Sequence, residues 1–242
     1  MSTFKDILAD ISSVLFPSLC PICGDELLDN EHFFCTACRF RAPQTNFCRN
    51  VDNPMTRRLE GLLPVERASA FMWFIDGSPW QDFIHRFKYS DRWLYARQIG
   101  EWFGSELAES GLYNDIDLVV PIPLHPIKRM KRTYNQSEYL ADGVAAALGA
   151  KVDRHSVIRH VNNSSQTTRS EHERWENVEE IFSVRRPDAL RNKHILLVDD
   201  VFTTGATIVS CGNAIIRALG QDNVRISVAT LATTQRSMAI DK

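Results

Sequence analysis

The alternation of apolar and polar positions divides the chain into three zones. From about residue 115 onward, short apolar runs rich in β-branched residues alternate with segments of helical periodicity. Such alternation is typical of an α/β fold with a mostly parallel central sheet and helices on both faces. The strands predicted by this pattern are Asp117–Pro121, Val152–Arg159, His194–Asp199 and Arg225–Leu231, and the helices are Gln136–Leu148 and Gly205–Ala218.

An earlier zone, from about residue 68 to 110, predicts one strand and two helices. The strand is Ala70–Ile75, and the helices are Pro79–Tyr89 and Arg92–Glu109. Apolar side chains of the second helix fall on one stripe, and this pattern is typical of burial in a core. The members of the stripe are Trp93, Ala96, Ile99, Trp102, Phe103 and Leu107.

The first zone, up to about residue 64, shows little periodicity after a short amphipathic stretch. Within Met1–Leu19, apolar residues recur at helical spacing, which predicts a helix that packs on the domain. We therefore expect two domains. Residues 1–64 would form this helix and a small cysteine-bearing module, and residues 65–242 would form the α/β domain.

The composition is that of an ordinary globular protein. The chain has 242 residues, 44% of them hydrophobic, and a formal net charge of −2. This balance provides no general attraction to nucleic acids or membranes, so such binding would need a local patch. No apolar run approaches the roughly 18–20 residues of a membrane span, and charges interrupt the N-terminus, so we expect neither a membrane helix nor a signal peptide. Six cysteines without an export signal favour reduced thiols and a cytoplasmic location.

Two Cys-x-x-Cys pairs lie close together in the first zone. They are Cys20 with Cys23 and Cys35 with Cys38, and 11 residues separate the pairs. Each pair can hold one side of a tetrahedral ion, and four thiolates suit a structural Zn²⁺ best. Gly24 can adopt the left-handed backbone that a metal knuckle tends to need. A redox dithiol is the alternative, but two pairs at this spacing favour a shared metal.

The segment Ile195–Thr207 carries the most chemistry. An apolar strand ends in Asp199 and Asp200, and a short loop then leads into a helix. In an open α/β sheet, ligands bind beyond the carboxyl ends of the strands. Sugar hydroxyls or a magnesium ion are the natural partners of the paired carboxylates. The loop suits a phosphate because it combines hydroxyl donors, close backbone approach and the free N–H groups of a helix start. Its residues are Thr203, Thr204, Gly205, Ala206 and Thr207.

The same loop has a simpler explanation, in which threonines cap a helix after an acidic strand end. The two acids and the whole Thr-Thr-Gly-x-Thr run occur together, and this combination favours a binding site. A P-loop is excluded, because the Gly-Lys-Ser/Thr ending of that motif is absent.

A proline-rich and basic segment follows the strand Asp117–Pro121. Lys128, Arg129, Lys131 and Arg132 concentrate positive charge there. Taken alone, such a run is typical of a solvated face or a weak polyanion patch. At the end of a neighbouring parallel strand, however, it lies where a pyrophosphate can bind.

Asp199, Asp200 and the loop after them resemble the phosphoribosyltransferase signature. The resemblance implies a type I phosphoribosyltransferase-like fold that binds phosphoribosyl pyrophosphate with Mg²⁺. The two acids would contact the ribose hydroxyls, and Thr203–Thr207 would hold the 5′-phosphate. The pyrophosphate loop would lie after Pro121. The chain is similar to amidophosphoribosyltransferases, but it departs from them at that loop. They carry small acidic and hydroxyl residues there, whereas this chain has His125-Pro-Ile.

The polar stretch Arg159–Phe182 resembles the flexible loop that closes over the site in this fold. A lid that excludes water protects a reactive sugar cation. A solvated helix of mixed charge is the alternative. The residues assigned to the lid are Gln166, Arg169, Arg174 and Asn177.

Along its whole length the chain resembles the ComF family, which includes proteins tied to DNA uptake in competent bacteria. Two departures stand out. Only Cys48 remains of a second cysteine group that many members carry, and the usual Arg-Gly-Phe-Asn-Gln appears as Arg-Thr-Tyr-Asn-Gln. The motifs that carry the resemblance are the zinc knuckle, His85–Tyr89, the Pro-Ile-Pro strand end, Arg132–Gln136, Gln166-Thr and the acidic loop.

Two functions follow from this pattern. The first is a Mg²⁺-dependent phosphoribosyltransferase of unknown acceptor, tied to nucleotide metabolism or DNA uptake. A nitrogen nucleophile would displace pyrophosphate, whose charge Lys128 and Arg129 would offset. The second is a non-catalytic sensor of phosphoribosyl pyrophosphate or a nucleotide, with a zinc knuckle and basic segment that bind nucleic acid or a protein. Single-strand binding needs aromatic platforms, and Tyr134 is the only aromatic residue adjoining that segment, which favours the enzyme.

Overall fold

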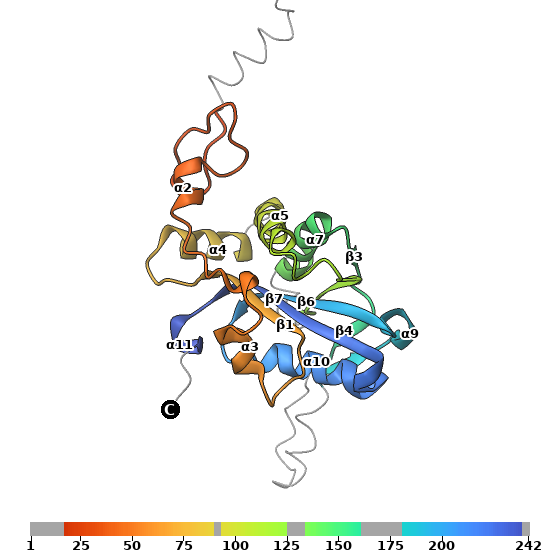
Figure 1. The fold of residues 1–242 in the computed structure, drawn as a ribbon. Helices are drawn as coiled ribbons and strands as arrows, with labels where there is room; N and C mark the ends of the chain where they lie inside the picture. The colour runs from red at the N-terminus through yellow and green to blue at the C-terminus, as the bar shows by residue number, and fades with distance from the viewer. Residues whose placement is uncertain (1–16, 90–92, 125–133, 161–180, 239–242) are drawn as a thin grey trace, which may run out of the picture. The chain divides into compact units, whose positions relative to one another are not determined.

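Five parallel strands form the central sheet (Figure 1). The computed structural model describes residues 17–89, 93–124, 134–160 and 181–238. Every neighbouring pair in the sheet runs parallel, which confirms the predicted fold class. In spatial order the strands are β1 (Arg67–Trp73), β7 (Val224–Thr233), β6 (Lys193–Phe202), β2 (Leu118–Pro121) and β3 (Lys151–Val152).

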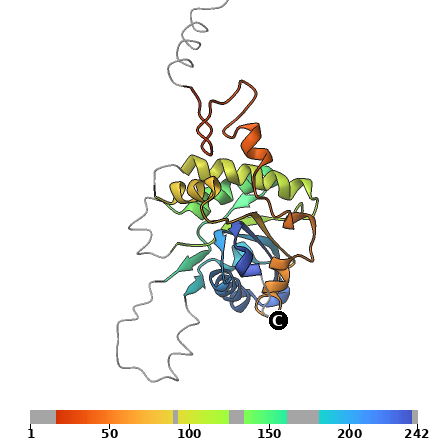
Figure 2. The same ribbon diagram turned by 90° about the vertical axis from the view of Figure 1, so that its left-hand side faces the viewer.

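Helices cover both faces of this sheet. Helices α5 (Trp93–Glu109) and α7 (Gln136–Leu148) lie on one face, and α3 (Pro54–Leu59) and α10 (Ala206–Leu219) lie on the other (Figures 1 and 2). Strand β6 is apolar on both faces, so both faces must be covered. Its residues 195–198 have no exposed surface, although successive side chains point to opposite faces. An apolar run without alternation is therefore the pattern of a strand buried on both sides.

Glycines set the close approach of α5 and α7. A Cβ atom at Gly100 or Gly143 would collide with the backbone of the partner helix, and one at Gly104 would lie 2.7 Å from the Cβ atom of Ala147. The two helix backbones therefore touch where these glycines lie. This contact fixes the position of the first turn of α7, which lies beside the end of β2.

The chain divides into two compact units. One comprises Met1–Pro43 and Ile75–His85, and the other comprises Gln44–Phe74 and Arg86–Lys242. The first unit holds α2 (Thr36–Phe40) and most of α4 (Pro79–Tyr89), and its aromatic core includes Phe34, whose ring centroid lies 5.5 Å from that of Phe83. The domain boundary expected after residue 64 stays a prediction.

The structure corrects the predictions for two strands and for one side chain. The strand expected at Val152–Arg159 is two short strands, β3 and β4 (Val157–Arg159), and β4 pairs antiparallel with β5 (Phe182–Val184) in a separate sheet. Strand β6 runs on to Phe202, so the two acids lie within the strand and not at its end. Trp93, expected in the core, is 42% exposed. The remaining short elements are η1 (Phe47–Arg49), α9 (Pro187–Leu190), η3 (Gln221–Asn223) and α11 (Gln235–Met238).

Several expectations fall on residues that the structure does not describe. The N-terminal amphipathic helix, the basic segment and the lid lie mostly or wholly within residues 1–16, 125–133 and 161–180. In the part of the chain that is described, no helix has both the length and the apolar character needed to cross a bilayer.

Candidate functional site

The paired acids lie at the carboxyl edge of the sheet. The pairing of β2 with β6 ends at Pro121 opposite Val198, so Asp199 is the first β6 residue beyond it. Both carboxylates are partly exposed there. They thus lie at the edge where open α/β sheets bind ligands.

A hydrogen bond from a neighbouring helix orients the first acid. The Ser137 hydroxyl donates to Asp199 Oδ1 at 3.0 Å, and the backbone N–H of Asp200 donates to the same oxygen at 2.9 Å. Asp200 Oδ1 accepts from the N–H of Val201 at 2.8 Å.

The loop after β6 owes its shape to one glycine. Gly205 has a φ of 79°, a left-handed conformation, and a Cβ there would lie 2.8 Å from the ring of Phe202. Helix α10 begins at the next residue, where the N–H of Ala206 donates to Thr204 Oγ1 at 3.4 Å, and the other N–H groups of its first turn face the loop. The exposed loop borders a shallow hollow of about 30 Å³. This hollow is lined by Asp199, Val201, Phe202, Thr203, Thr204, Gly205, Ala206, Thr207 and Ile208.

The first turn of α7 joins this site to the end of β2. Asn135 is the N-cap: its side-chain oxygen accepts from the N–H of Ser137 at 3.3 Å. Its amide nitrogen donates to the carbonyl of Ile122 at 3.1 Å. The buried Asn135 therefore holds Ser137 where its hydroxyl reaches Asp199.

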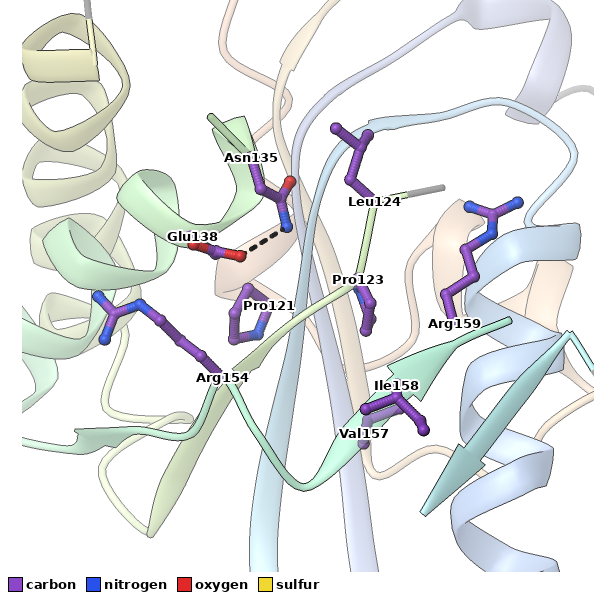
Figure 3. A pocket seen from close by; sticks show the side chains of 9 residues that line it. All are labelled: Pro121, Pro123, Leu124, Asn135, Glu138, Arg154, Val157, Ile158 and Arg159. Carbon is purple, nitrogen blue, oxygen red and sulfur yellow. Dashed lines mark hydrogen bonds between the residues drawn. The ribbon is translucent and has the colours of Figure 1, made fainter. Parts of the chain in front are cut away.

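A larger pocket opens beside this turn. It measures about 260 Å³ and lies between the end of β2, the start of α7 and β4 (Figure 3). Its walls combine apolar side chains with one carboxylate and two guanidinium groups. The lining residues are Pro121, Pro123, Leu124, Asn135, Glu138, Arg154, Val157, Ile158 and Arg159.

The four predicted metal ligands come together in the other unit. The Sγ atoms of Cys20, Cys23, Cys35 and Cys38 all lie within 4.8 Å of one another, and those of Cys23 and Cys35 are 3.7 Å apart. Tetrahedral zinc with Zn–S bonds of about 2.3 Å needs sulfurs about 3.8 Å apart, so the four thiols fit one such ion. Gly24 has the expected left-handed conformation, with a φ of 81°.

Backbone N–H groups favour the thiolate form of one ligand. Burial works to raise the pKa of Cys20, but backbone hydrogen bonds from Cys35, Cys23 and Ile22 outweigh it and bring the pKa to about 7. A metal must displace the thiol proton on binding. For Cys20 this displacement therefore costs little near neutral pH.

The structure brings some of the predicted site residues together and not others. Asp199 and the loop Thr203–Thr207 line one shallow hollow, and Asp200 follows Asp199 in β6. Lys128 and Arg129, and the lid residues Gln166, Arg169, Arg174 and Asn177, lie outside the described residues. Sequence reasoning assigned no roles to Ser137 and Glu138 and placed Arg159 at the start of the lid. The structure places Ser137 beside the acids, and Glu138 and Arg159 in the adjacent pocket.

The chain has relatives of known name along most of its length. It is 25% identical to the DNA utilization protein YhgH of Escherichia coli (strain K12) over 213 residues, which cover 83% of this chain and 92% of that protein. It is 27% identical to competence protein ComFC of Bacillus subtilis (strain 168) over 191 residues, 78% of this chain and 74% of that protein. No protein-family model matches the chain. These relatives confirm the resemblance to ComF-type proteins.

Among solved structures, similarity is found to a glutamine phosphoribosylpyrophosphate amidotransferase from B. subtilis. The TM-score is 0.41 at 18% identity, covering 60% of this chain and 30% of that chain. A hypoxanthine phosphoribosyltransferase from Staphylococcus aureus has a TM-score of 0.34 at 15% identity, covering 61% of this chain and 68% of that chain.

Proposed function

We propose that the chain binds 5-phosphoribosyl pyrophosphate at the loop between β6 and α10 and transfers its phosphoribosyl group to a nitrogen acceptor. The observation that carries this proposal is the joint placement of two groups. Asp199 and Asp200 present carboxylates at the carboxyl edge of the sheet, and Thr203–Thr207 form a hydroxyl-bearing loop around a left-handed glycine directly before a helix start. Carboxylates suit ribose hydroxyls, and the loop suits a phosphate.

In this proposal each group acts on a different part of the donor. Asp199 and Asp200 accept hydrogen bonds from the 2- and 3-hydroxyls of the ribose, while the loop holds the 5′-phosphate. The bond from the anomeric carbon to pyrophosphate breaks, and a bond to the acceptor nitrogen forms. Mg²⁺, a hard cation that prefers oxygen ligands, would offset the charge of the pyrophosphate. Lys128 and Arg129 would assist, and the lid containing Gln166, Arg169, Arg174 and Asn177 would exclude water.

Titration with phosphoribosyl pyrophosphate and Mg²⁺ tests the binding step. We expect binding by the unmodified chain, and a loss of at least tenfold in affinity for the Asp199→Asn, Asp200→Asn double variant. Unchanged affinity in that variant would remove the assignment of the acids to the ribose. Release of pyrophosphate in the presence of a panel of bases tests transfer, and binding without release for any base would count against catalysis.

The names of the relatives support a proposal for the cellular role of this activity. They concern DNA utilization and competence, so we propose that the activity serves nucleotide metabolism or DNA uptake. We further propose a cytoplasmic location, where the thiols of the four-cysteine cluster would stay reduced. The four-cysteine cluster would hold a structural zinc ion, because four thiolates close the coordination sphere and leave no open position for a substrate.

A second candidate function is a non-catalytic sensor that also binds single-stranded nucleic acid, and an aromatic cluster favours it. The ring of Tyr139 lies 5.3 Å from that of Trp93 and 5.3 Å from that of Tyr134. Trp93 is exposed, so it offers a stacking face. In the sequence Tyr134 is the only aromatic residue beside the basic segment, but in the structure it belongs to this aromatic cluster. Fluorescence anisotropy with a labelled oligothymidylate tests this candidate: binding that Trp93→Ala weakens severalfold would support it, and equal binding would not.

A further inference from the structure

An aromatic side chain of the compact unit with the four-cysteine cluster, here called the cysteine unit, lies almost wholly in water. Phe40, the last residue of α2, is 91% exposed. Its sequence neighbours Arg39 and Arg41 are exposed as well, and we call the three residues the basic patch. A single exposed apolar side chain is common, so the meaning of Phe40 depends on what surrounds it and what could cover it.

A second patch of the same unit combines exposed leucines with carboxylates. Leu28 is 67% exposed and Leu19 is 55% exposed. Leu19 pairs with Glu26 in an isolated antiparallel bridge, and Asp29 follows Leu28 in the chain. Both carboxylates are exposed. We call these four residues the acidic patch.

The two patches lie at opposite ends of α2. The Glu31 carboxylate accepts from the N–H of Leu28 at 3.1 Å and from the N–H of Thr36, the first residue of α2, at 2.6 Å. The acidic patch therefore adjoins the start of the helix, whereas Phe40 ends it. None of the five residues of α2 is buried, and the helix rises only about 6 Å from its first residue to its last. One small partner surface can therefore cover both patches.

The charges of both patches are available to a partner. Within the described ranges, neither the Arg41 guanidinium nor the carboxylates of Glu26 and Asp29 take part in an ion pair. Apolar side chains beside unpaired charges of one sign fit a surface that combines apolar side chains with the opposite sign. Each patch is such a surface for the other, but the two lie at opposite ends of one helix and do not meet within one molecule.

We infer that the cysteine unit pairs with the same unit of a second copy of the chain, basic patch against acidic patch. With the two α2 helices antiparallel about a two-fold axis, each basic patch meets the acidic patch of the other copy, and the contact forms twice. A nucleic acid fits this surface less well, because its phosphates would be repelled by Glu26 and Asp29 and would leave the leucines uncovered. A paired chain carries each of its binding sites twice, which raises its avidity for a polymeric ligand.

The contact should be weak and sensitive to salt. Interfaces that bury less than roughly 1,200 Å² in total are typical of transient complexes, and the two patches comprise few residues. Exposed ion pairs are screened by salt, so association should weaken as the ionic strength rises. The inference does not depend on the proposed function, because neither patch contains a residue assigned to the phosphoribosyl site.

Sedimentation equilibrium of the full chain tests the inference. We expect the mass of one chain, 27.6 kDa, at low concentration, and a rise toward twice that mass between about 10 µM and about 1 mM, the range of weak transient contacts. Arg41→Glu and Asp29→Lys each place like charges together at both contacts of the pair. Each variant should therefore associate about tenfold more weakly, and so should Phe40→Ser, which removes the aromatic ring.

A mixture of the two charge variants is the decisive sample. When an Arg41→Glu chain pairs with an Asp29→Lys chain, one contact has both charges reversed and the other has both native charges. Both contacts are then complementary, so the mixture should associate about as tightly as the unmodified chain, although neither variant does so alone. Leu62→Ser changes an exposed leucine of the other compact unit and should leave association unchanged.

Hydrogen exchange of backbone amides across residues 18–41, at low concentration, shows which variants keep the fold of the cysteine unit. Three results would overturn the inference. A chain that stays monomeric over the whole range leaves the patches to residues 1–16 or to a different protein. Undiminished association of folded Arg41→Glu and Phe40→Ser assigns the pairing to another surface. A mixture of the charge variants that stays monomeric contradicts the reciprocal contact.

Discussion

The hydroxyl of Ser137 donates a hydrogen bond of 3.0 Å to the carboxylate of Asp199, across 62 positions of sequence. The bond connects the first turn of α7 to β6, and so connects the segment after β2 to the paired acids. A hydroxyl that donates to one oxygen of a partly buried carboxylate stabilises the charged form and fixes its rotamer. The geometry of the proposed ribose site therefore depends on a helix that does not belong to the acidic motif.

Replacement of Ser137 by alanine should weaken both stability and ligand binding. Asp199 loses a donor while staying partly buried, so we expect the free energy of unfolding to fall by about 1–2 kcal/mol. Affinity for phosphoribosyl pyrophosphate should fall severalfold, because the carboxylate is no longer held in one orientation. Urea denaturation and calorimetric titration measure the two effects.

Ser105→Ala provides the control for this change. The Ser105 hydroxyl donates to the carbonyl of Glu101 at 2.9 Å on an exposed face of α5, far along the chain from the acids. We expect this variant to bind the ligand normally. Equal loss of affinity in the two variants would mean that the Ser137 contact has no special role.

The second prediction concerns the contact of α5 with α7. A Cβ at Gly143 would collide with the backbone atoms of Arg97 and Glu101, which cannot move without shifting the helix. We expect Gly143→Ala to lower the free energy of unfolding by about 3 kcal/mol, despite the better helix propensity of alanine. Urea denaturation measures the loss.

Gly212→Ala is the matched comparison, since Gly212 also lies inside a helix. Its Cβ would meet only the flexible end of the Leu63 side chain, at 2.6 Å, and that end can rotate. We expect a clearly smaller loss than at Gly143. If the two variants are equally unstable, backbone approach between the helices is not what requires glycine at position 143.

A buried histidine predicts the pH dependence of stability. The His194 ring is fully buried, with Nε2 2.9 Å from the Ser227 hydroxyl and Nδ1 3.1 Å from Asp115. Burial lowers the pKa of His194, although Asp115 opposes this, and two arginines that pair with Asp115, Arg67 and Arg225, add to the lowering. The folded state therefore keeps His194 neutral at pH values where the unfolded chain is protonated.

The direction of the pH effect on stability depends on which state binds more protons. As the pH falls below about 6.5, the unfolded state takes up a proton that the folded state does not, so stability declines by up to about 1.4 kcal/mol per pH unit. The arginines hold the pKa of Asp115 well below its usual range, so its contribution is lost only in stronger acid. His194→Gln should flatten the decline between about pH 6.5 and 5, measured by denaturation, whereas His155→Gln, at an exposed site, should not. An unchanged slope in His194→Gln would assign the decline to other groups.

The sequence predicts elements that depend on local patterns better than it predicts contacts between distant residues. The run Ile195–Val198 and the glycine at 205 predict β6 and its loop because each signal lies within a few residues. The break inside Val152–Arg159 has a local cause as well: the Asp153 side chain accepts from the N–H groups of His155 and Ser156 at 2.8 Å, and this turn ends the strand. An Asp that can accept from the backbone N–H groups two and three residues later favours a turn, and the apolar pattern obscures this signal.

The parts of the site that sequence does not predict are contacts between distant elements. Nothing near Ser137 indicates that its hydroxyl reaches Asp199, and nothing near Trp93 indicates that Tyr139 lies beside it. The exposure of Trp93 also depends on tertiary structure, because the helical stripe to which it belongs continues one turn beyond the core. The first contact follows from the packing of α7 against β6, and the second from the packing of α5 against α7.

The last prediction concerns the four-cysteine cluster. We expect the purified chain to contain one zinc ion, and Cys35→Ser to lose it, because three thiolates and a hydroxyl bind zinc far more weakly than four thiolates. Cys48→Ser is the control: Cys48 is buried outside the cluster, so the zinc content should be unchanged. Metal released by a thiol reagent and detected with a chromogenic chelator measures the content.

Removal of zinc should unfold the module locally. The module buries few apolar side chains, and a structural zinc ion contributes roughly 10 kcal/mol of folding free energy to such domains. Chelation should therefore accelerate hydrogen exchange of backbone amides across residues 18–41, while amides of β6 and β7 keep their protection because their hydrogen bonds lie within the parallel sheet. Full protection of residues 18–41 in metal-free protein would show that the cysteines do not depend on a metal for their arrangement.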